Sequence, residues 1–515
     1  MEVPAKVLKK CKKNLSLPIK LIWEESYLSG IIPKHYKFQF IIPIHKKESP
    51  AYASNYRPIS LTSHIIKIFE RILKKHLVQY LEENCILNTK QHGFRKGKSC
   101  LTQLLAHYDD LLSNALFEND TDVVYLDFAK AFDKIDHKLL LKKLSIYGIS
   151  GNIFKWIENF LKDRHQSVAL NGELSFISLV LSGVPQGSVL GPILFLLYIN
   201  DLVDVTQHSI CRSFADDTRL SKSISTCNDM TQLQNDLSNV IKWSYENNMI
   251  LNEDKFQLMS FNINKNSLMS NLPFTNDIVR YTTPSGIVMQ PESTVKDLGI
   301  YLSDDFQWTH HITEIASRAT RQAAWVLNTF SDRRDFVMLT LFKSLVRSHL
   351  EFCCPLWNPQ CAKDIQTLEL IQYNFISKIY GMEHLNYWEQ LEKLKLDSLQ
   401  RRRERYCIIH MWKIKNNLAP NDLDFEFYNN RQGSRVHLQP IIRASSKFQT
   451  LRDNSFIHIG PKLWNLLPYE VSSKTSLNTF KVALYQFLRK YPDKPSLPRL
   501  TYVNNNSLLS YPLFL

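Results

Sequence analysis

The sequence predicts an α+β protein built from two or three subdomains. Short apolar segments such as residues 38–44 and 123–128, bounded by polar turns, indicate strands in the first part of the chain. Beyond residue 299 the apolar spacing becomes helical almost throughout. The chain is also 515 residues long, which exceeds what a single hydrophobic core usually serves.

The expected elements follow from local pattern. Residues 38–44 form an apolar strand, a basic loop covers 45–47, and a second extended piece begins at Tyr56, so a basic hairpin is predicted. Apolar residues recur every three or four positions over 65–81, which indicates a helix. Further helical patterns cover residues 101–108, 153–161 and 193–199.

Acidic residues occur where strands are expected. Asp127 lies near the end of the apolar segment 123–128, and Asp216 and Asp217 are predicted at the tip of a hairpin over residues 210–221. Phosphoryl transfer with two metal ions needs clustered oxygen ligands, which aspartates on rigid elements supply. The pattern fits such a site if the fold brings 127 and 216 together; alone, the acid pair is typical of a surface turn.

Charge and hydropathy limit the partners. Lysine and arginine number 63 against 49 acidic residues, giving a net charge of +14 and a pI near 9.1, which favours a polyanion such as nucleic acid or an anionic membrane surface. We find no apolar run that could span a bilayer and no signal peptide, so we expect an intracellular protein of the nucleus or cytoplasm, not a secreted one. The nine cysteines lack zinc-ligand spacing.

Seven short blocks follow one another in a characteristic order. They are NYRPISL at 55–61, QHGFRKGKS at 91–99, LDFAKAFD at 126–133, GVPQGSVLGP at 183–192, FADD at 214–217, LNEDK at 251–255 and VKDLG at 295–299. In order and spacing these blocks resemble the reverse transcriptase of non-LTR retrotransposons, the jockey-like LINE elements. The resemblance covers about residues 20–305, and PKLWNLLP at 461–468 is similar to the tail of such proteins.

The resemblance implies a right-hand polymerase fold, with fingers, a palm that bears an antiparallel sheet, and a helical thumb. The implied division is a basic lead over residues 1–24, fingers and palm over 25–303, a thumb-like region over 304–400, a C-terminal region of unknown role over 401–490 and a flexible tail over 491–515.

The resemblance also assigns roles to residues. It makes Asp127, Asp216 and Asp217 the catalytic ligands of Mg²⁺ or Mn²⁺. The remaining roles are the grip on the dNTP triphosphate by Lys46 and Arg57, exclusion of a ribose 2′-hydroxyl by Phe132, packing against nucleotide and template by Gln186 and Gly187, and protonation of pyrophosphate by Lys255. Template-backbone contacts are expected from Arg95, Lys96 and Lys98.

The implied function is an RNA-directed DNA polymerase that uses an RNA template, a DNA or RNA primer and dNTPs, without a membrane partner; no protein partner is indicated. Two alternatives stay open, a catalytically silent nucleic-acid-binding remnant and an RNA-dependent RNA polymerase. Phe132 argues against the second alternative. Relatives carry an endonuclease domain before the polymerase blocks, so we expect a truncated copy.

Overall fold

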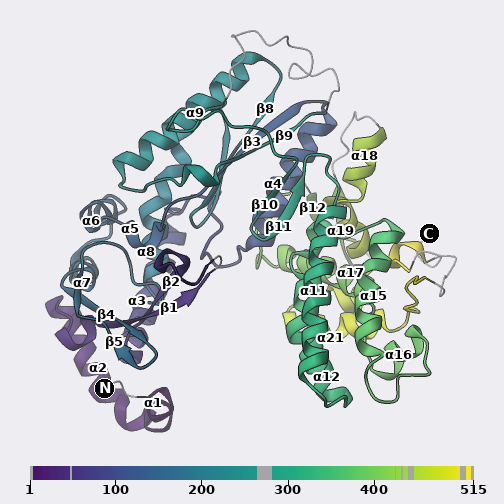
Figure 1. Cartoon of the computed structure of the whole chain (residues 1–515), viewed down its shortest axis with the longest axis horizontal. Coiled ribbons are helices and arrows are strands. Elements are labelled where there is room, and N and C mark those ends of the chain that lie inside the picture. Colours follow the sequence, from purple (N-terminus) through teal and green to yellow (C-terminus); the bar gives the residue numbers. More distant parts are fainter. Residues whose placement is uncertain are drawn as a thin grey trace.

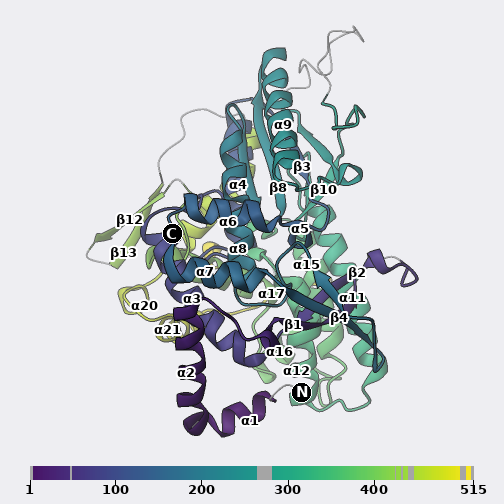
Figure 2. The same cartoon turned by 90° about the vertical axis from the view of Figure 1, so that its left-hand side faces the viewer.

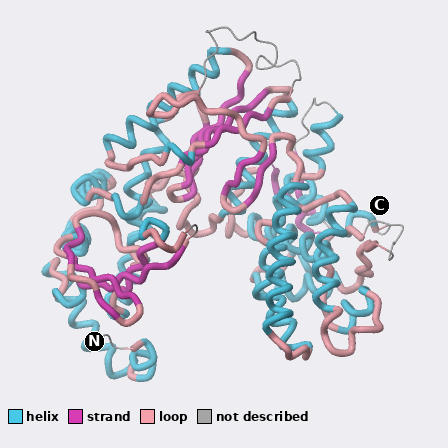
Figure 3. The backbone as a smooth tube through the Cα atoms, viewed as in Figure 1, coloured by secondary structure: helices cyan, strands magenta, loops and turns pink. Residues whose placement is uncertain are grey.

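The computed structural model describes residues 4–46, 49–263, 281–423, 425–430, 433–438, 446–498 and 506–511. Figure 1 shows the elements arranged as an arch, with one sheet at the N-terminal foot, a second sheet at the top and a helical assembly at the other foot. Strands are concentrated in the first two parts and helices dominate the third (Figure 3). Within the described ranges, no helix is both long enough and apolar enough to cross a membrane.

The N-terminal foot is a mixed sheet in the order β2-β1-β4-β5, with β6 paired to β4. The predicted basic hairpin is its β1–β2 pair, in which Ile44 lies opposite Arg57. Figure 2 shows α1 and α2 projecting from this foot. The elements are α1 (Ala5–Lys10), α2 (Lys12–Ser29), β1 (Phe38–His45), β2 (Tyr56–Leu61), α3 (His64–Glu83), α6 (His137–Ile146), α7 (Gly151–Leu161), β4 (Arg164–Leu170), β5 (Glu173–Leu174) and β6 (Ser178–Val180).

The second sheet is antiparallel and has the order β7-β8-β3-β9. Its strands and helices are α4 (Cys100–Leu116), β3 (Asp120–Leu126), α5 (Ala131–Lys134), α8 (Gly191–Ile199), β7 (Ile210–Phe214), β8 (Asp217–Ile224), α9 (Cys227–Glu246) and β9 (Gln257–Phe261). A separate hairpin of β10 (Thr294–Asp297) and β11 (Ile300–Ser303) follows.

The central strand β3 is buried on both faces and divides two hydrophobic cores. Val123 and Tyr125 pack in one core with α4 and the helical region, whereas Val124 and Leu126 pack in the other with α8 and α9. Because successive side chains of a strand point to opposite faces, β3 serves both cores at once. This double burial explains why residues 123–126 of β3 are apolar without alternation.

The third part is a helical assembly in which α11 packs on α15 and α17 packs on α19. Its elements are α11 (Thr309–Thr329), α12 (Asp335–Leu341), α13 (Arg347–Glu351), α14 (Cys354–Trp357), α15 (Ala362–Ile376), α16 (Tyr387–Lys393), α17 (Leu399–Lys415), β12 (Phe425–Asn430), β13 (Gly433–Leu438), α18 (Ser446–Asp453), α19 (Phe456–Asn465), α20 (Tyr469–Ser472) and α21 (Leu477–Leu488). The predicted α+β right-hand fold with an added helical region is therefore confirmed.

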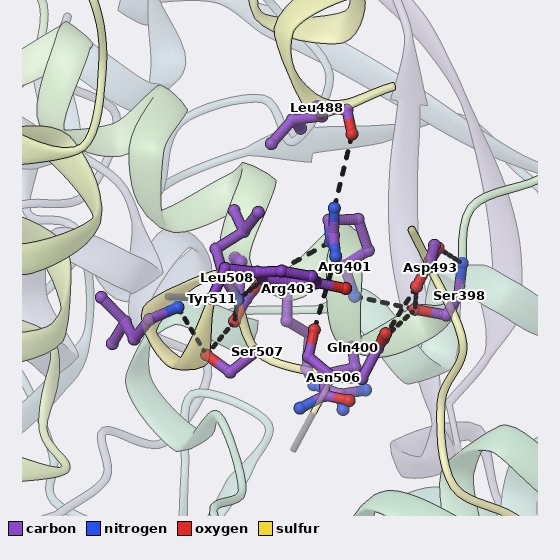
Figure 4. Close-up of polar contacts among 12 residues, drawn as sticks. Ser398, Gln400, Arg401, Arg403, Leu488, Asp493, Asn506, Ser507, Leu508 and Tyr511 are labelled. Atoms are coloured by element: carbon purple, nitrogen blue, oxygen red, sulfur yellow. Dashed lines mark hydrogen bonds and ion pairs between the residues drawn. The ribbon is translucent and has the colours of Figure 1, made fainter. Parts of the chain in front are cut away.

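The basic run at 401–403 lies inside α17, and two of its guanidinium groups are buried. Arg401 donates hydrogen bonds to the carbonyl groups of Leu488, Pro492 and Asn506 at 3.4, 3.0 and 3.4 Å (Figure 4). A boundary at residue 401 would therefore divide α17, whose Arg401 side chain binds three backbone carbonyl groups of the region beyond residue 487.

The predicted flexible tail, 491–515, lies partly outside the described residues. Of its described part, Ser507 donates a hydrogen bond to the buried Glu404 carboxylate at 2.5 Å, and the backbone N–H of Leu508 donates to the same group at 3.1 Å. Desolvation raises the pKa of Glu404 to about 7, and nearby Arg401 opposes this shift. Residues 506–511 are thus packed against α17.

We predict that Arg401→Met destabilises the protein by about 3 kcal/mol, because it removes three hydrogen bonds and leaves Glu404 buried without its cation. Urea unfolding followed by circular dichroism measures the change. Arg334→Met, which removes an exposed pair with Asp332, is the control and should leave the free energy of unfolding close to that of the wild type. Equal losses in the two variants would contradict the prediction.

Candidate active site

The pairing of β3 with β8 places the predicted acids side by side. Their register runs from Asp120 opposite Ile224 to Leu126 opposite Thr218, so the next position on each strand is Asp127 and Asp217. Asp216 lies in the two-residue turn that joins β7 to β8. The sequence predicted both acids at the hairpin tip; the structure places Asp216 in the turn and makes Asp217 the first residue of β8.

The surroundings of Asp216 and Asp217 raise the pKa of both carboxyl groups. Burial, followed by the negative charges of Asp216 and Asp127, raises the pKa of Asp217 to about 6. Burial and Asp127 also raise the pKa of Asp216. A raised pKa means that the ionised form of the carboxyl group is disfavoured. The nearby cations therefore do not fully offset the burial and the negative charge of these acids.

Lys255 reaches this cluster from the segment before β9. Its ammonium group forms an ion pair with the Asp127 carboxylate. The segments that carry Asp127 and Lys255 are also joined through their backbones, since the N–H of Asn252 donates a hydrogen bond to the Asp127 carbonyl at 2.8 Å. The structure therefore brings Lys255 to the acids, as the block LNEDK suggested.

Two cations of the β1–β2 hairpin face the acids from the N-terminal foot. Lys46 and Arg57 are exposed, and both lower the pKa of Asp216 through their charge. They lie at the loop end of the hairpin, where the N–H of Lys46 donates to the Asn55 carbonyl at 2.8 Å. The hairpin thus presents positive charge toward the carboxylates.

Phe132 is held by other aromatic rings. Its ring stacks on Phe195 with centroids 4.3 Å apart and an interplanar angle of 11°, and it meets the edge of Phe94 at 5.8 Å. The Phe132 carbonyl also accepts a hydrogen bond from Val184 at 2.9 Å. The ring is half-buried, so its position is determined by packing and not by solvent.

Gln186 and Gly187 connect the loop before α8 to the β1–β2 hairpin. The Gln186 side chain donates to the Asp133 carboxylate at 2.9 Å, and its carbonyl accepts from the Ser60 N–H at 2.7 Å. Gly187 has φ +121°, and a Cβ there would lie 2.7 Å from the Ser60 carbonyl oxygen. Only glycine fits at position 187, because the loop backbone approaches β2 so closely that a side chain would clash with it.

Two of the residues expected to contact a template are engaged within the protein. Arg95 donates two hydrogen bonds to Glu82, at 3.3 and 2.9 Å, and also bonds the Asn88 carbonyl at 2.7 Å. Lys98 donates to the Thr89 carbonyl. These contacts turn both cations toward their own loop, whereas Lys96 is exposed.

A buried ion pair beside the acids was not predicted from the sequence. Arg219 of β8 contacts Asp297 of β10, and both are buried. Arg219 also lowers the pKa of Asp217 through its charge. The sequence could have indicated this pair, because an arginine inside a predicted strand and an acid in the VKDLG block each need a partner of opposite charge when they are buried.

A cavity of ≈ 380 Å³ joins these groups, with Asp127, Asp217, Lys255, Arg219 and Asp297 in its lining. The donor chemistry fits a hard divalent cation, since carboxylate oxygens are the preferred ligands of Mg²⁺. Among the described residues, however, no group of three or more histidine, cysteine, aspartate and glutamate side chains is arranged to hold a metal ion. A metal ion bound through Oδ2 of Asp127 would compete with the Lys255 ammonium for that oxygen.

A family model described as "Reverse transcriptase (RNA-dependent DNA polymerase)" matches residues 44–302, which is half of the chain. The chain belongs to the reverse transcriptase family. The matched segment begins in β1 and ends in β11, so it contains all three acids and Lys255.

Named relatives agree with the jockey-like resemblance, which is confirmed. "Probable RNA-directed DNA polymerase from transposon X-element" of Drosophila melanogaster is 27% identical over 385 residues, covering 73% of this chain and 41% of that protein. "RNA-directed DNA polymerase from mobile element jockey" of the same species is 25% identical over 409 residues, covering 76% and 43%. This reverse transcriptase chain thus spans less than half the length of these relatives.

Among solved structures, telomerase from Candida albicans in complex with a fragment of telomeric RNA is 13% identical to this reverse transcriptase chain. The match covers 76% of this chain and 65% of that chain, with a TM-score of 0.38.

We predict that Asp217→Asn raises the melting temperature of the metal-free protein at pH 8. The folded-state pKa of Asp217, about 6, lies above its ordinary value of 3.8, so ionisation of this carboxyl lowers stability as pH rises between these values. The gain from Asn should therefore grow from about pH 4 to about pH 6 and stay level above that.

Differential scanning fluorimetry across pH in EDTA measures this gain. Glu392→Gln, which removes an exposed carboxylate from α16, is the control and should give no gain that depends on pH in this range. A gain for Asp217→Asn that is the same at every pH would contradict the raised pKa of Asp217, which comes from burial and from the neighbouring carboxylates.

Proposed function

We propose that this chain is an RNA-directed DNA polymerase of a non-LTR retrotransposon, which adds dNTPs to the 3′-hydroxyl of a DNA or RNA primer on an RNA template. One observation carries this proposal. The β3–β8 register gathers Asp127, Asp216 and Asp217 at one point, opposite the cationic hairpin that bears Lys46 and Arg57.

The proposed roles follow from charge and position. Asp127, Asp216 and Asp217 would hold divalent ions, Mg²⁺ or Mn²⁺, which when bound supply activation of the primer oxygen and stabilisation of the leaving pyrophosphate. The Lys46 ammonium and the Arg57 guanidinium would bind the triphosphate of the dNTP. Both face Asp216 and have no acidic partner within 4.0 Å among the ion pairs of the described residues, so they are available to a phosphate.

Phe132, Gln186 and Gly187 would shape the nucleotide site. The Phe132 ring, fixed by stacking on Phe195, would exclude a 2′-hydroxyl. Gln186 and Gly187 hold the loop before α8 against β2, so they would set the distance between the hairpin cations and the palm. Lys255 would supply the proton for pyrophosphate, since it is the ammonium group closest to the acids in this part of the chain.

The wider assignments rest on the same proposal. Residues 25–303 would form fingers and palm, 304–400 a thumb, and 401–490 a C-terminal region without an assigned role. The net charge of +14 supports binding of an RNA template and a primer. A polymerase that copies the RNA of its own element would act in the nucleus or the cytoplasm.

We expect the wild-type chain to incorporate dTTP on poly(rA) primed with oligo(dT) in Mg²⁺. Asp216→Asn and Asp217→Asn should each reduce kcat by roughly 10³-fold or more, because each removes a charged metal ligand. Glu392→Gln is the matched surface control and should keep full activity. Wild-type protein that binds RNA at low salt but adds no nucleotide would instead indicate a silent remnant.

Phe132→Val should raise the ratio of rUTP to dTTP incorporation by roughly tenfold, because a smaller side chain leaves room for a 2′-hydroxyl. Single-nucleotide extension with each substrate measures kcat/KM, and the value for dTTP shows whether the variant is otherwise competent. A ratio that does not change would remove Phe132 from the nucleotide site.

A further inference from the structure

A buried glutamine side chain grips the turn that carries the catalytic acids. Gln91 is 2% exposed. Its Oε1 accepts hydrogen bonds from the N–H groups of Ala215 and Gly93, each at 2.8 Å, and its Nε2 donates to the Ala215 carbonyl at 3.2 Å. One amide group therefore satisfies both polar groups of the residue that directly precedes Asp216.

Ala215, which the Gln91 side chain binds, has an unfavourable backbone conformation. Ala215 has φ +56°, in the left-handed region that an alanine adopts only when its surroundings impose it. Gly93 packs against the same residue so closely that a Cβ at 93 would lie 2.3 Å from the Ala215 nitrogen. The segment around Gln91 thus supplies the contacts that hold Ala215 in this conformation.

The same segment also extends the palm sheet. Gln91 forms a parallel bridge with Ser213, and the N–H of His92 donates to the Ser213 carbonyl at 3.0 Å. The Ser213 N–H donates in return to the Lys90 carbonyl at 3.2 Å. Residues 90–92 therefore cover the otherwise open edge of β7, which continues into the turn.

The loop that presents Gln91 is fixed from several sides. Arg95 ties it to Glu82 and to the Asn88 carbonyl, and Lys98 ties it to Thr89. The Asn88 side chain donates to Asp204 at 2.8 Å. Two of the three cations expected at the template, Arg95 and Lys98, thus support the loop that presents Gln91.

We propose that Gln91 is a positioning residue for nucleotidyl transfer: its amide fixes the Ala215 peptide groups and thereby aims Asp216 and Asp217. The catalytic part of this statement rests on the proposed function. The positional part does not, because it concerns the hydrogen bonds of a turn that the metal-free protein already contains.

A purely structural role would be shared by other buried glutamines, and the chain offers a matched case. Gln390 is 1% exposed and donates to the carbonyl groups of Met382 and Leu385, each at 3.0 Å. It lies in α16, in the helical region. Gln390→Met and Gln91→Met therefore make the same chemical change, and both remove hydrogen bonds from a buried amide to the backbone.

Two measurements test the proposal. Hydrogen–deuterium exchange with mass spectrometry follows the peptide that contains residues 211–218, and primer extension on poly(rA)/oligo(dT) gives kcat and KM for dTTP. In Gln91→Met we expect exchange of this peptide to rise about fivefold or more, because the Ala215 N–H loses its acceptor. We expect kcat to fall roughly 100-fold while KM changes by less than about threefold.

Gln390→Met should change neither the exchange of residues 211–218 nor kcat. Gln91→Glu, which keeps the acceptor but loses the donor, should give an intermediate loss of kcat. This variant replaces Gln91→Met in the test if the methionine variant does not fold. An unchanged kcat in a variant whose 211–218 peptide exchanges faster would overturn the proposal, as would equal effects of the two methionine variants. If the wild-type chain does not extend primers, the proposed function fails, while the exchange comparison still decides whether Gln91 holds the turn.

Discussion

Three carboxylates that repel one another are held at one point by the pairing of β3 with β8, and the other features of the site depend on this pairing. Asp127 and Asp217 are 90 positions apart in the sequence, and their side-by-side placement follows from a register of seven residue pairs. The raised pKa of Asp217 shows that this placement is unfavourable for the acids themselves. Burial of β3 on both faces provides the stabilisation that keeps the strands in register despite this cost.

The cations that offset this charge come from separate parts of the fold. Lys255 precedes β9, Arg219 lies in β8 with Asp297 beside it, and Lys46 and Arg57 belong to the β1–β2 hairpin. Only Lys255 forms a direct ion pair with one of the three acids among the described residues. The site is therefore a charge balance among several elements, in which a divalent ion would replace an ammonium contact at Asp127.

Much of this arrangement could be predicted from the sequence, because the relevant signals are local. Residues 38–44, 65–81 and 123–128 match β1, α3 and most of β3, and the block order indicated which acids would meet. The direction of charged side chains could not be predicted, since it depends on partners far along the chain. Arg95 turns inward toward Glu82, and Arg401 lies inside the helical region and donates to the carbonyl groups of Leu488 and Asn506.

Because β3 is buried on both faces, the stability of the first half of the chain also depends on the second half. The face of Val123 and Tyr125 is covered by a core that runs from Phe261 through Phe306 to Phe448 of α18. A copy shortened after β11 would expose this apolar face on the strand that leads to Asp127, and an exposed apolar face of this kind promotes aggregation and recognition by proteases. Shortened genomic copies of such an element would accordingly be lost as insoluble protein, even when every acid of the site is still encoded.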